Sequence, residues 1–465
     1  MKLLWSCIGI LMVMNLVGQS DLNPVLSYDQ YIARVITYHP MVQQGNLTRA
    51  FGDAALLEAR GGFDPKVSTS LSQKQFKDDP YYSLFNAQLD IPTRTGIKVT
   101  TGYDRTSGIN LNPENLDPNA GLVYAGVSVP LGAGLLYDER RAQLDRAKLT
   151  QDATLIEQIQ LMNDLVLDAG VSYWQWWLDY QTYQIFERGA QNALELLAGV
   201  RDAAVVGDRA AIDTVEARIQ YQNLLVERDQ ALLDYVTSTL QLSTYLWDAN
   251  GQPQLIDESV RPSGPQDINQ LGGPLDIIGD TMALVDNHPE LQMNAVKLNQ
   301  LDVDQRLARE FSKPRVDIKY NLLADAGSSF TSTITPRNYT WGLDIGFPLL
   351  FRKERAKIKM NEIYIADTQL DRDIKRLQIK AKIDASLAKW DGYRGQFSRY
   401  TTVLGDYQRM LEAERELFAN GESSLFLINS RQAKYIEASL KWNDLQAKIM
   451  IQGLDTQYAA GRMLP

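Results

Sequence analysis

The amino-acid sequence predicts a membrane protein of the α+β class, in which amphipathic β-strands lead into very long α-helices. Three observations support this prediction. The chain of 465 residues repeats one order of landmarks in its two halves. Several segments of about ten residues alternate between apolar and polar side chains, as strands with lipid on one face do. Two stretches of about 70 residues contain no proline, the residue that interrupts helices.

The N-terminal residues 1–18 are interpreted as a secretory signal peptide. Lys2 supplies a positive start, residues 3–17 form an apolar run, and Gly18 offers a cleavage point. A membrane anchor is the alternative, but the run is shorter than the roughly 20 residues that span a bilayer. Cys7 is the only cysteine, so the mature chain would contain neither a disulfide nor a thiolate metal site.

The composition excludes some classes of function. The formal net charge is −10, and no dense run of lysine and arginine indicates a nucleic-acid partner. No Gly-rich phosphate loop, nucleophile elbow or zinc motif occurs, so we predict that the protein is not an enzyme and has no cofactor. No later stretch is apolar enough for a transmembrane helix, so insertion into a membrane would require a β-barrel.

The duplication is visible in the spacing of a few landmarks. Pro65 follows His39 by 26 residues, and Pro314 follows His288 by 26 residues. The next landmarks are a proline that ends a β-like run and a glycine that leads a turn: Pro130 and Gly207 in the first half, Pro348 and Gly421 in the second. These features predict a first repeat at 19–250 and a second repeat at 276–465. The segment 251–275 between them is rich in glycine and proline and is predicted to be a connector.

Each repeat is predicted to begin with two helices that meet at a His-Pro pair. The second helix runs from about 41 to 60 and from about 290 to 311. Proline suits the first turn of a helix, so His39–Pro40 and His288–Pro289 are interpreted as structural helix starts. The alternative is a two-histidine metal site. We predict no metal, because no cysteine or carboxylate cluster would complete the ligand set.

The strands of the first repeat are predicted within 66–130 and those of the second within 315–348. The individual strands are expected near 66–76, 84–91, 96–105, 121–129, 315–325 and 338–347. Phe85, Leu89 and Ile91 would share one face of a strand, while Gln88 and Asp90 would lie on the other. Such alternation suits strands between lipid and water. An amphipathic sheet on a soluble core would give the same pattern.

The strand-ending prolines Pro130 and Pro348 are each predicted to lead into a long helical hairpin. The hairpins would span about 135–249, with a tip near 207, and about 351–460, with a tip near 421. A helix of about 70 residues is roughly 100 Å long, so it must pack laterally, as in a coiled coil or helical barrel. The predicted seam residues after the tips are Ile212, Val215, Ile219, Leu425 and Ile428, and the predicted caps are Asp208 with Ser423 or Ser424.

An aromatic cluster at 173–183 lies on the first long helix. The second long helix carries Trp390, Tyr393, Phe397 and Tyr400 at a comparable distance past its proline. One interpretation of such a cluster is that its aromatic side chains stack on a bound carbohydrate. We predict packing against neighbouring helices, because the aromatic layer occurs in both repeats.

These motifs together resemble the TolC-like outer-membrane efflux family, also called outer membrane factors. The similar segments are "YDQYIARVITYHPMV", "DTMALVDNHPEL", the two proline-ended strand regions and the glycine-led tips, of which "GESSLFLINSRQAKYIEA" is the nearest match. The resemblance covers essentially the whole mature chain. It implies a homotrimer in which three chains form one β-barrel in the outer membrane. The barrel would continue as an α-helical barrel into the periplasm.

The resemblance implies a function as well as a fold. The trimer would be the duct of a tripartite efflux system that exports small molecules. Its expected partners are a periplasmic adaptor (membrane fusion) protein, an inner-membrane RND or ABC transporter and outer-membrane lipid. One alternative is the outer-membrane duct of a type I protein secretion system. A different class of function is a periplasmic coiled-coil scaffold that forms no channel.

The resemblance also implies that the tips contact the adaptor and form the gate. The candidate residues are Gly207, Asp208, Asp213, Glu216, Gly421, Ser424, Leu427, Asn429 and Ser430. Well-known family members carry aspartates six and nine residues after the second tip glycine, where this chain has Leu427 and Ser430. Asp213 keeps the aspartate six residues after the first glycine. A solvated first helical turn remains the alternative for Asp213 and Glu216.

The number of strands also departs from the family pattern. The family usually has two strands per repeat and twelve in the trimer, and the second repeat fits that number. The first repeat is predicted to have four strands, with an additional hairpin near 84–105. Either all strands insert and the barrel is larger, or this hairpin lies outside the membrane.

Overall fold

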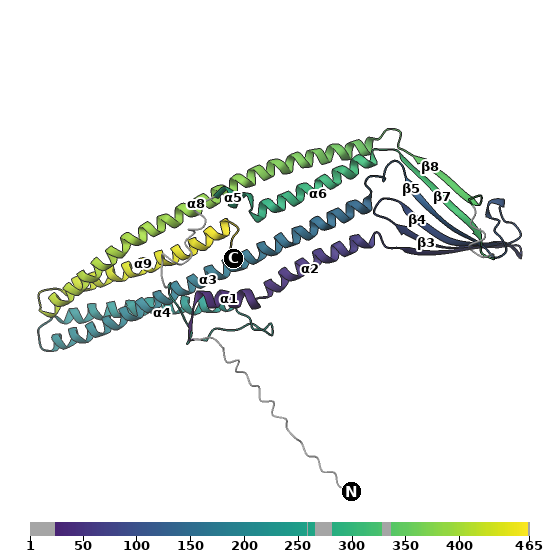
Figure 1. The fold of residues 1–465 in the computed structure, drawn as a ribbon. Coiled ribbons are helices and arrows are strands. Elements are labelled where there is room, and N and C mark those ends of the chain that lie inside the picture. The colour runs from purple at the N-terminus through teal and green to yellow at the C-terminus, as the bar shows by residue number, and fades with distance from the viewer. Residues whose placement is uncertain (1–23, 258, 266–280, 328–335, 464–465) are drawn as a thin grey trace, which may run out of the picture. The chain divides into compact units, whose positions relative to one another are not determined.

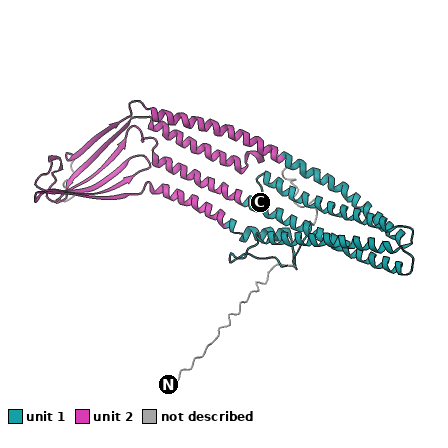
Figure 2. Cartoon of the chain, turned by 180° about the vertical axis from the view of Figure 1, so that it is seen from behind, with its two compact units in different colours: residues 1–42, 162–279, 384–465 teal, residues 43–161, 280–383 magenta. Residues whose placement is uncertain are grey.

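The computed structural model describes residues 24–257, 259–265, 281–327 and 336–463 (Figure 1). The predicted signal peptide and part of the predicted connector lie outside these residues. The chain divides into two compact units, which Figure 2 colours separately. The helical unit comprises residues 1–42, 162–279 and 384–465, and the sheet unit comprises residues 43–161 and 280–383. Both units take segments from both predicted repeats, and the division into repeats stays a prediction.

The sheet unit contains a curled antiparallel sheet of six strands (Figure 1). In spatial order the strands are β2 (Lys66–Phe76), β3 (Asp79–Pro92), β4 (Lys98–Ser107), β5 (Leu122–Pro130), β7 (Arg315–Asp325) and β8 (Tyr339–Gly346). A short 3₁₀ helix, η1 (Pro113–Asn115), precedes β5. All six predicted strands are observed. The additional hairpin pairs within this sheet, with β3 bonded to β2 and β4 bonded to β5.

The register of the sheet gives each face one kind of side chain. Val99 on β4 lies opposite Val127 on β5, which lies opposite Tyr320 on β7, which lies opposite Trp341 on β8. Side chains alternate along a strand, so the neighbouring rows carry polar residues on the other face. A shift of one residue would exchange the two faces, so the alternation fixes the register.

The helices of the sheet unit pack through small apolar clusters. Its helices are α2 (Pro40–Gly61), α5 (Thr281–Asp286), α6 (Pro289–Phe311) and parts of the two long helices α3 (Glu139–Val205) and α8 (Arg352–Ala419). Leu56 on α2 packs against Leu144 and Ala147 on α3. Gly52 permits this close approach, because a Cβ atom there would lie 2.3 Å from the hydroxyl oxygen of Thr154. Lys375 on α8 pairs with Glu290 on α6 at 2.9 Å.

The helical unit is built around the aromatic cluster. It contains α1 (Tyr28–Tyr38), α4 (Ala211–Ser243), α9 (Leu425–Ala459), parts of α3 and α8, and the parallel pair β1 (Val25–Leu26) and β6 (Arg261–Pro262). Tyr173 and Trp176 are fully buried. The Tyr173 hydroxyl lies 2.9 Å from the Leu26 carbonyl oxygen, and the Trp176 indole donates to Thr239 at 2.8 Å. The prediction of packing is therefore confirmed for these residues.

The two tip turns have the same backbone geometry. Gly207 after α3 has φ of +86°, and Gly421 after α8 has φ of +76°. In each turn, the residue after the glycine donates its backbone N–H to a carbonyl five residues earlier, and the glycine donates to a carbonyl three residues earlier. This is the Schellman motif, which requires a left-handed residue that glycine adopts without steric strain.

The predicted seam is only partly observed within one chain. Leu425 and Ile428 on α9 are buried in a cluster with α3 and α4, as predicted. Ile212, Val215 and Ile219 are exposed in the single chain, so their place in a seam stays a prediction. On α4 a different face, which includes Ala217, points into the cluster. Among the described helices, none is both long and apolar enough to cross a membrane.

Candidate functional sites on the sheet and at the helical tip

One face of the sheet carries a network of polar side chains. The side-chain amide of Asn86 donates to Asp104 at 2.6 Å and to the Tyr124 hydroxyl at 3.1 Å. The same hydroxyl donates to Gln88 at 3.1 Å. A cavity of about 750 Å³ lies over this face. The satisfied polar groups make this surface suited to contact with water.

The opposite face of the sheet is apolar and exposed. Trp341 has 65% of its surface exposed, Ile345 has 61% and Leu71 has 62%. Val99, Val127, Tyr320 and Leu343 add further exposed apolar surface on the same face. A contiguous apolar surface of this kind is rare on soluble monomers and indicates contact with lipid or protein. The sheet can therefore separate an aqueous space from an apolar one.

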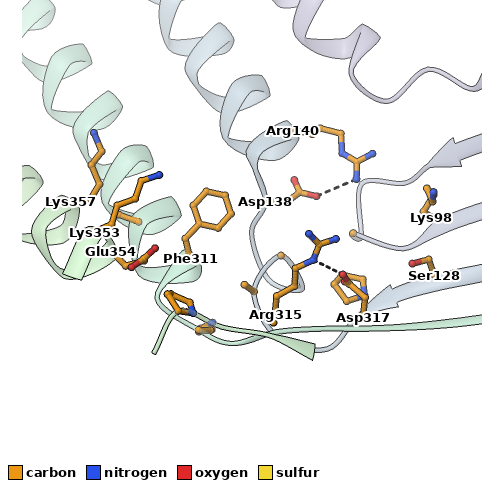
Figure 3. A pocket seen from close by; sticks show the side chains of 18 of the residues that line it. Lys98, Ser128, Asp138, Arg140, Phe311, Arg315, Asp317, Lys353, Glu354 and Lys357 are labelled. Atoms are coloured by element: carbon orange, nitrogen blue, oxygen red, sulfur yellow. Dashed lines mark hydrogen bonds and ion pairs between the residues drawn. The ribbon is translucent and has the colours of Figure 1, made fainter. Parts of the chain in front are cut away.

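A second cavity, of about 680 Å³, lies where the strands meet the starts of α3 and α8 (Figure 3). Its lining includes Lys98, Arg315, Lys353 and Lys357. The strand-to-helix prolines Pro130 and Pro348 also line it, at the positions where the sequence predicts the change from strand to helix.

The predicted caps at the tips are partly correct. Ser424 is the N-cap of α9, and its side chain accepts a hydrogen bond from the Leu427 backbone N–H at 3.4 Å. Asp208 does not cap α4, because that helix begins later, with Ala210 as its N-cap and no side-chain bond. Asp208 instead donates its backbone N–H to the Ala203 carbonyl in the turn.

The structure brings some of the predicted tip residues together. The side-chain amide of Asn429 donates to Glu216 at 3.4 Å, which joins α9 to α4. Leu427 is exposed, whereas Asp213 and Ser430 are half-buried. Neither of these two side chains has a hydrogen bond to another described residue. Their roles in partner contact and gating stay predictions.

A further contact between the two tips was not predicted from the sequence. Arg209 donates to the backbone carbonyl oxygens of Phe418 and Ser423, both at 3.4 Å. Its guanidinium group also lies 4.2 Å from the centre of the Phe418 ring. Arg209 follows the tip glycine in the sequence, but nothing in the sequence indicates that its partners belong to the other hairpin.

A buried carboxylate supports the second tip. Glu414 on α8 is buried, accepts a hydrogen bond from the Ser423 hydroxyl and lies 3.6 Å from the Arg431 guanidinium nitrogen. A buried carboxylate with these partners holds the turn against both helices of the hairpin. Ser423 was predicted only as a possible cap, and nothing in the sequence indicated Glu414 or Arg431.

The two histidines perform the same structural task. In each case the ring Nδ1 accepts a hydrogen bond at 3.2 Å from a backbone N–H two residues later: Met41 for His39 and Glu290 for His288. These bonds confirm the helix-start prediction, with Pro40 and Pro289 as the first residues of α2 and α6. Burial lowers the pKa of both histidines, which keeps Nδ1 free to accept. Within the described parts of the chain, no three His, Cys, Asp or Glu residues form a potential metal site.

Comparisons with solved structures place this fold among outer-membrane channels. The CmeC outer membrane channel of Campylobacter jejuni has a TM-score of 0.64 and 12% identity, with 93% of this chain and 85% of that chain covered. The open-state MtrE outer membrane channel of Neisseria gonorrhoeae has a TM-score of 0.65 and 11% identity, with 94% and 89% covered. The outer membrane protein VceC of Vibrio cholerae has a TM-score of 0.64 and 9% identity, with 93% and 96% covered.

No protein-family model and no curated protein matches the sequence. The structural likeness extends over nearly the full length of both partners in each comparison. At these identities it establishes the fold, and it confirms the fold resemblance inferred from the sequence motifs.

Proposed function

We propose that this chain is a member of the TolC-like outer membrane factor family and forms a duct through the outer membrane that extends into the periplasm. The observation that carries the proposal is the two-faced sheet. Its polar face would line a water-filled lumen, and its exposed apolar face would contact lipid. The shared fold with outer-membrane channels supports the same conclusion.

The duct would be a homotrimer, as the family resemblance implies, and the sheet of one chain would need other copies to close a barrel. The sheet has free edges at β2 and β8, and an open sheet edge is not stable in lipid. The helix α4 also carries exposed apolar residues at intervals of seven: Ile212, Ile219, Val226, Leu233 and Leu240. A seven-residue repeat is typical of helices that pack laterally against another helix. We name these five residues the α4 stripe and assign it to the contact with a neighbouring copy.

Each chain would consist of two tandem repeats. The order of two helices, strands and two long helices occurs first as α1 to α4 and again as α5 to α9. The matching His-Pro caps and Schellman turns support this division. The proposed repeats are 19–250 and 276–465, joined by the connector 251–275.

The tips would form the gate at the periplasmic end. Arg209 and Asn429 each join the first hairpin to the second. A duct performs no chemistry, so opening requires only that the tip helices separate when a periplasmic adaptor binds more strongly to the open state. An inner-membrane RND or ABC transporter would supply energy, and small molecules would be the cargo. A type I secretion duct would share this architecture.

Conductance in planar bilayers tests the proposed function. The purified full chain should produce channels, and the double variant Arg209→Ala/Asn429→Ala should increase the open fraction because it removes bonds between the hairpins. Arg218→Ala is a matched control, since Arg218 is an exposed arginine on α4. If neither the wild type nor the double variant conducts, the duct proposal is wrong. Recovery of the protein only in the soluble periplasmic fraction would instead favour the coiled-coil scaffold.

A further inference from the structure

The cavity where the strands meet the long helices has an unequal distribution of charge. Seven cationic side chains line it, against three carboxylates, Asp138, Asp317 and Glu354, and we define the basic pocket by these cations: Lys98, Arg140, Lys313, Arg315, Lys319, Lys353 and Lys357. They come from β4, α3, the α6–β7 connection, β7 and α8. Figure 3 shows several of them around the same space. Residues distant in the sequence thus present positive charge to one cavity.

The acidic partners of these cations do not neutralise the surface of the cavity. Arg315 pairs with Asp317 at 2.5 Å, but the Arg315 side chain is 74% exposed and that of Asp317 only 12%. Lys313 is 44% exposed, whereas its partner Glu310 is 6% exposed. The Arg140 side chain is likewise more exposed than that of its partner Asp138, with 37% against 16%. In these three pairs the carboxylate is more buried than the cation. Lys319 pairs with the exposed Asp344 at 2.9 Å, but Asp344 does not line the cavity.

Two of the seven cations have no ion pair with a described acidic residue. Lys353 and Lys357 lie one turn apart on α8, are exposed, and have no ion pair with a described residue. They occupy the first two turns of α8, where the helix dipole disfavours cations and favours anions. Glu354 lies between them in the sequence and also lines the cavity, so the two lysines leave one excess positive charge at this helix start, which an anion in the cavity would compensate.

The position of the pocket indicates which anions can reach it. Lys98 and Arg315 belong to the polar face of the sheet, since they share it with Ser128 and Asp317. In the proposed duct that face lines the lumen, whereas lipid contacts the opposite face. The anion would therefore come from the aqueous lumen. Rings of lysine and arginine are the usual means by which pores select anions and phosphates.

We propose that the basic pocket is an anion-binding site in the lumen. This site would favour solutes that carry phosphate or several carboxylate groups. This inference rests on the proposed duct function and assigns a chemical class to part of its cargo. Arginine recognises such groups through paired N–H donors, and the lysines act as point charges. Three copies of the pocket in a trimer would raise the local concentration of anions at this level of the lumen.

Block of single channels by inorganic pyrophosphate tests the proposal. In zwitterionic bilayers, pyrophosphate should reduce the conductance of the wild type. The variant Lys353→Gln/Lys357→Gln should require about tenfold more pyrophosphate for the same block, because charge-assisted contacts are lost. Removing these lysines leaves no buried carboxylate unpaired, so the variant should still conduct. Arg352→Gln/Arg355→Gln is the matched control on the same turns of α8, since neither arginine lines the cavity. This control should be blocked like the wild type.

The outcomes separate this inference from the proposed function. Absence of any conductance would contradict the duct itself. Two outcomes would overturn only the anion-binding site. One is a conducting wild type that pyrophosphate does not block, and the other is equal block of all three proteins. A third outcome is block that disappears when the bilayer contains anionic lipid. If anionic lipid leaves the residual block of Lys353→Gln/Lys357→Gln unchanged, repulsion of pyrophosphate by the membrane surface is excluded as the cause. A lipid headgroup then occupies the pocket, which would overturn the assignment to solutes from the lumen.

Discussion

His288 combines a structural role with a charge that depends on pH. It is 8% exposed at the N-cap of α6, and its Nδ1 accepts the Glu290 backbone N–H. Burial lowers its pKa below the ordinary value of 6.5, Glu290 acts in the opposite direction, and Lys382 and Lys375 add to the lowering. Protonation would convert the acceptor into a donor and break the cap.

This cap should make the protein less stable in mild acid. Below pH 6.5 the histidine of the unfolded chain binds a proton more readily than the folded one, so stability contributed by neutral His288 is lost as the pH falls. We expect the wild type to lose about 1 kcal/mol more than His288→Asn between pH 7.5 and pH 5, since asparagine caps without titrating. Thermal unfolding of both proteins at the two pH values measures this difference. An equal pH dependence would contradict the assignment.

Gly421 and Gly405 offer a matched pair of substitutions on α8 and its turn. A Cβ atom would meet nothing within 4 Å at either position, but only Gly421 has a positive φ, of +76°. Gly421→Ala should therefore destabilise the tip by about 1–2 kcal/mol. Gly405→Ala should stabilise its helix by up to about 1 kcal/mol. Hydrogen exchange of the α8–α9 hairpin should slow for Gly405→Ala and accelerate for Gly421→Ala, and changes of the same sign would contradict this account.

Among the elements, β8 tests which face of the sheet meets lipid. Thr340 and Trp341 are neighbours on β8 and point to opposite faces. Trp341→Lys should destabilise the protein folded in lipid vesicles by about 2 kcal/mol or more in folding free energy. Thr340→Lys should be tolerated, because Thr340 lies on the face that we assign to the lumen. Folding yield in vesicles, followed by protease resistance, compares the two variants. Equal yields would mean that the apolar face does not contact lipid.

The helices and strands were predicted well where the sequence shows a hydrophobic period or where proline and glycine mark the ends of a segment. Long proline-free stretches ended by a glycine gave α3 and α8 close to their observed bounds, because proline and left-handed glycine have strong local effects. The same logic failed for Asp208, since the local sequence does not show that α4 begins after an uncapped Ala210. Arg209 and Glu414 were missed because their partners lie on other segments, and tertiary contacts of this kind leave no periodic signal in the sequence.

The assembly should depend on the α4 stripe. Its residues are 52–68% exposed in the single chain, and they would be buried against a neighbouring copy. Leu233→Lys should prevent or weaken trimer formation, because it places a charge in an apolar seam. Glu227→Lys, an exposed position off the stripe, should leave the trimer intact. Native mass spectrometry in detergent distinguishes these outcomes, and a stable Leu233→Lys trimer would require a different interface.

If the proposed duct forms, the six-stranded sheet determines which part of it limits the flow. Three copies would place eighteen strands around the lumen, and the diameter of a barrel grows roughly in proportion to its strand number. In electrical terms, a barrel of this width would be a conductor in series with the gate that we propose at the tips. Its resistance would contribute little to the total. The measured conductance would therefore depend almost entirely on the gate at the tips. A solute too large for a barrel of twelve strands could still leave through this barrel after it had passed the gate.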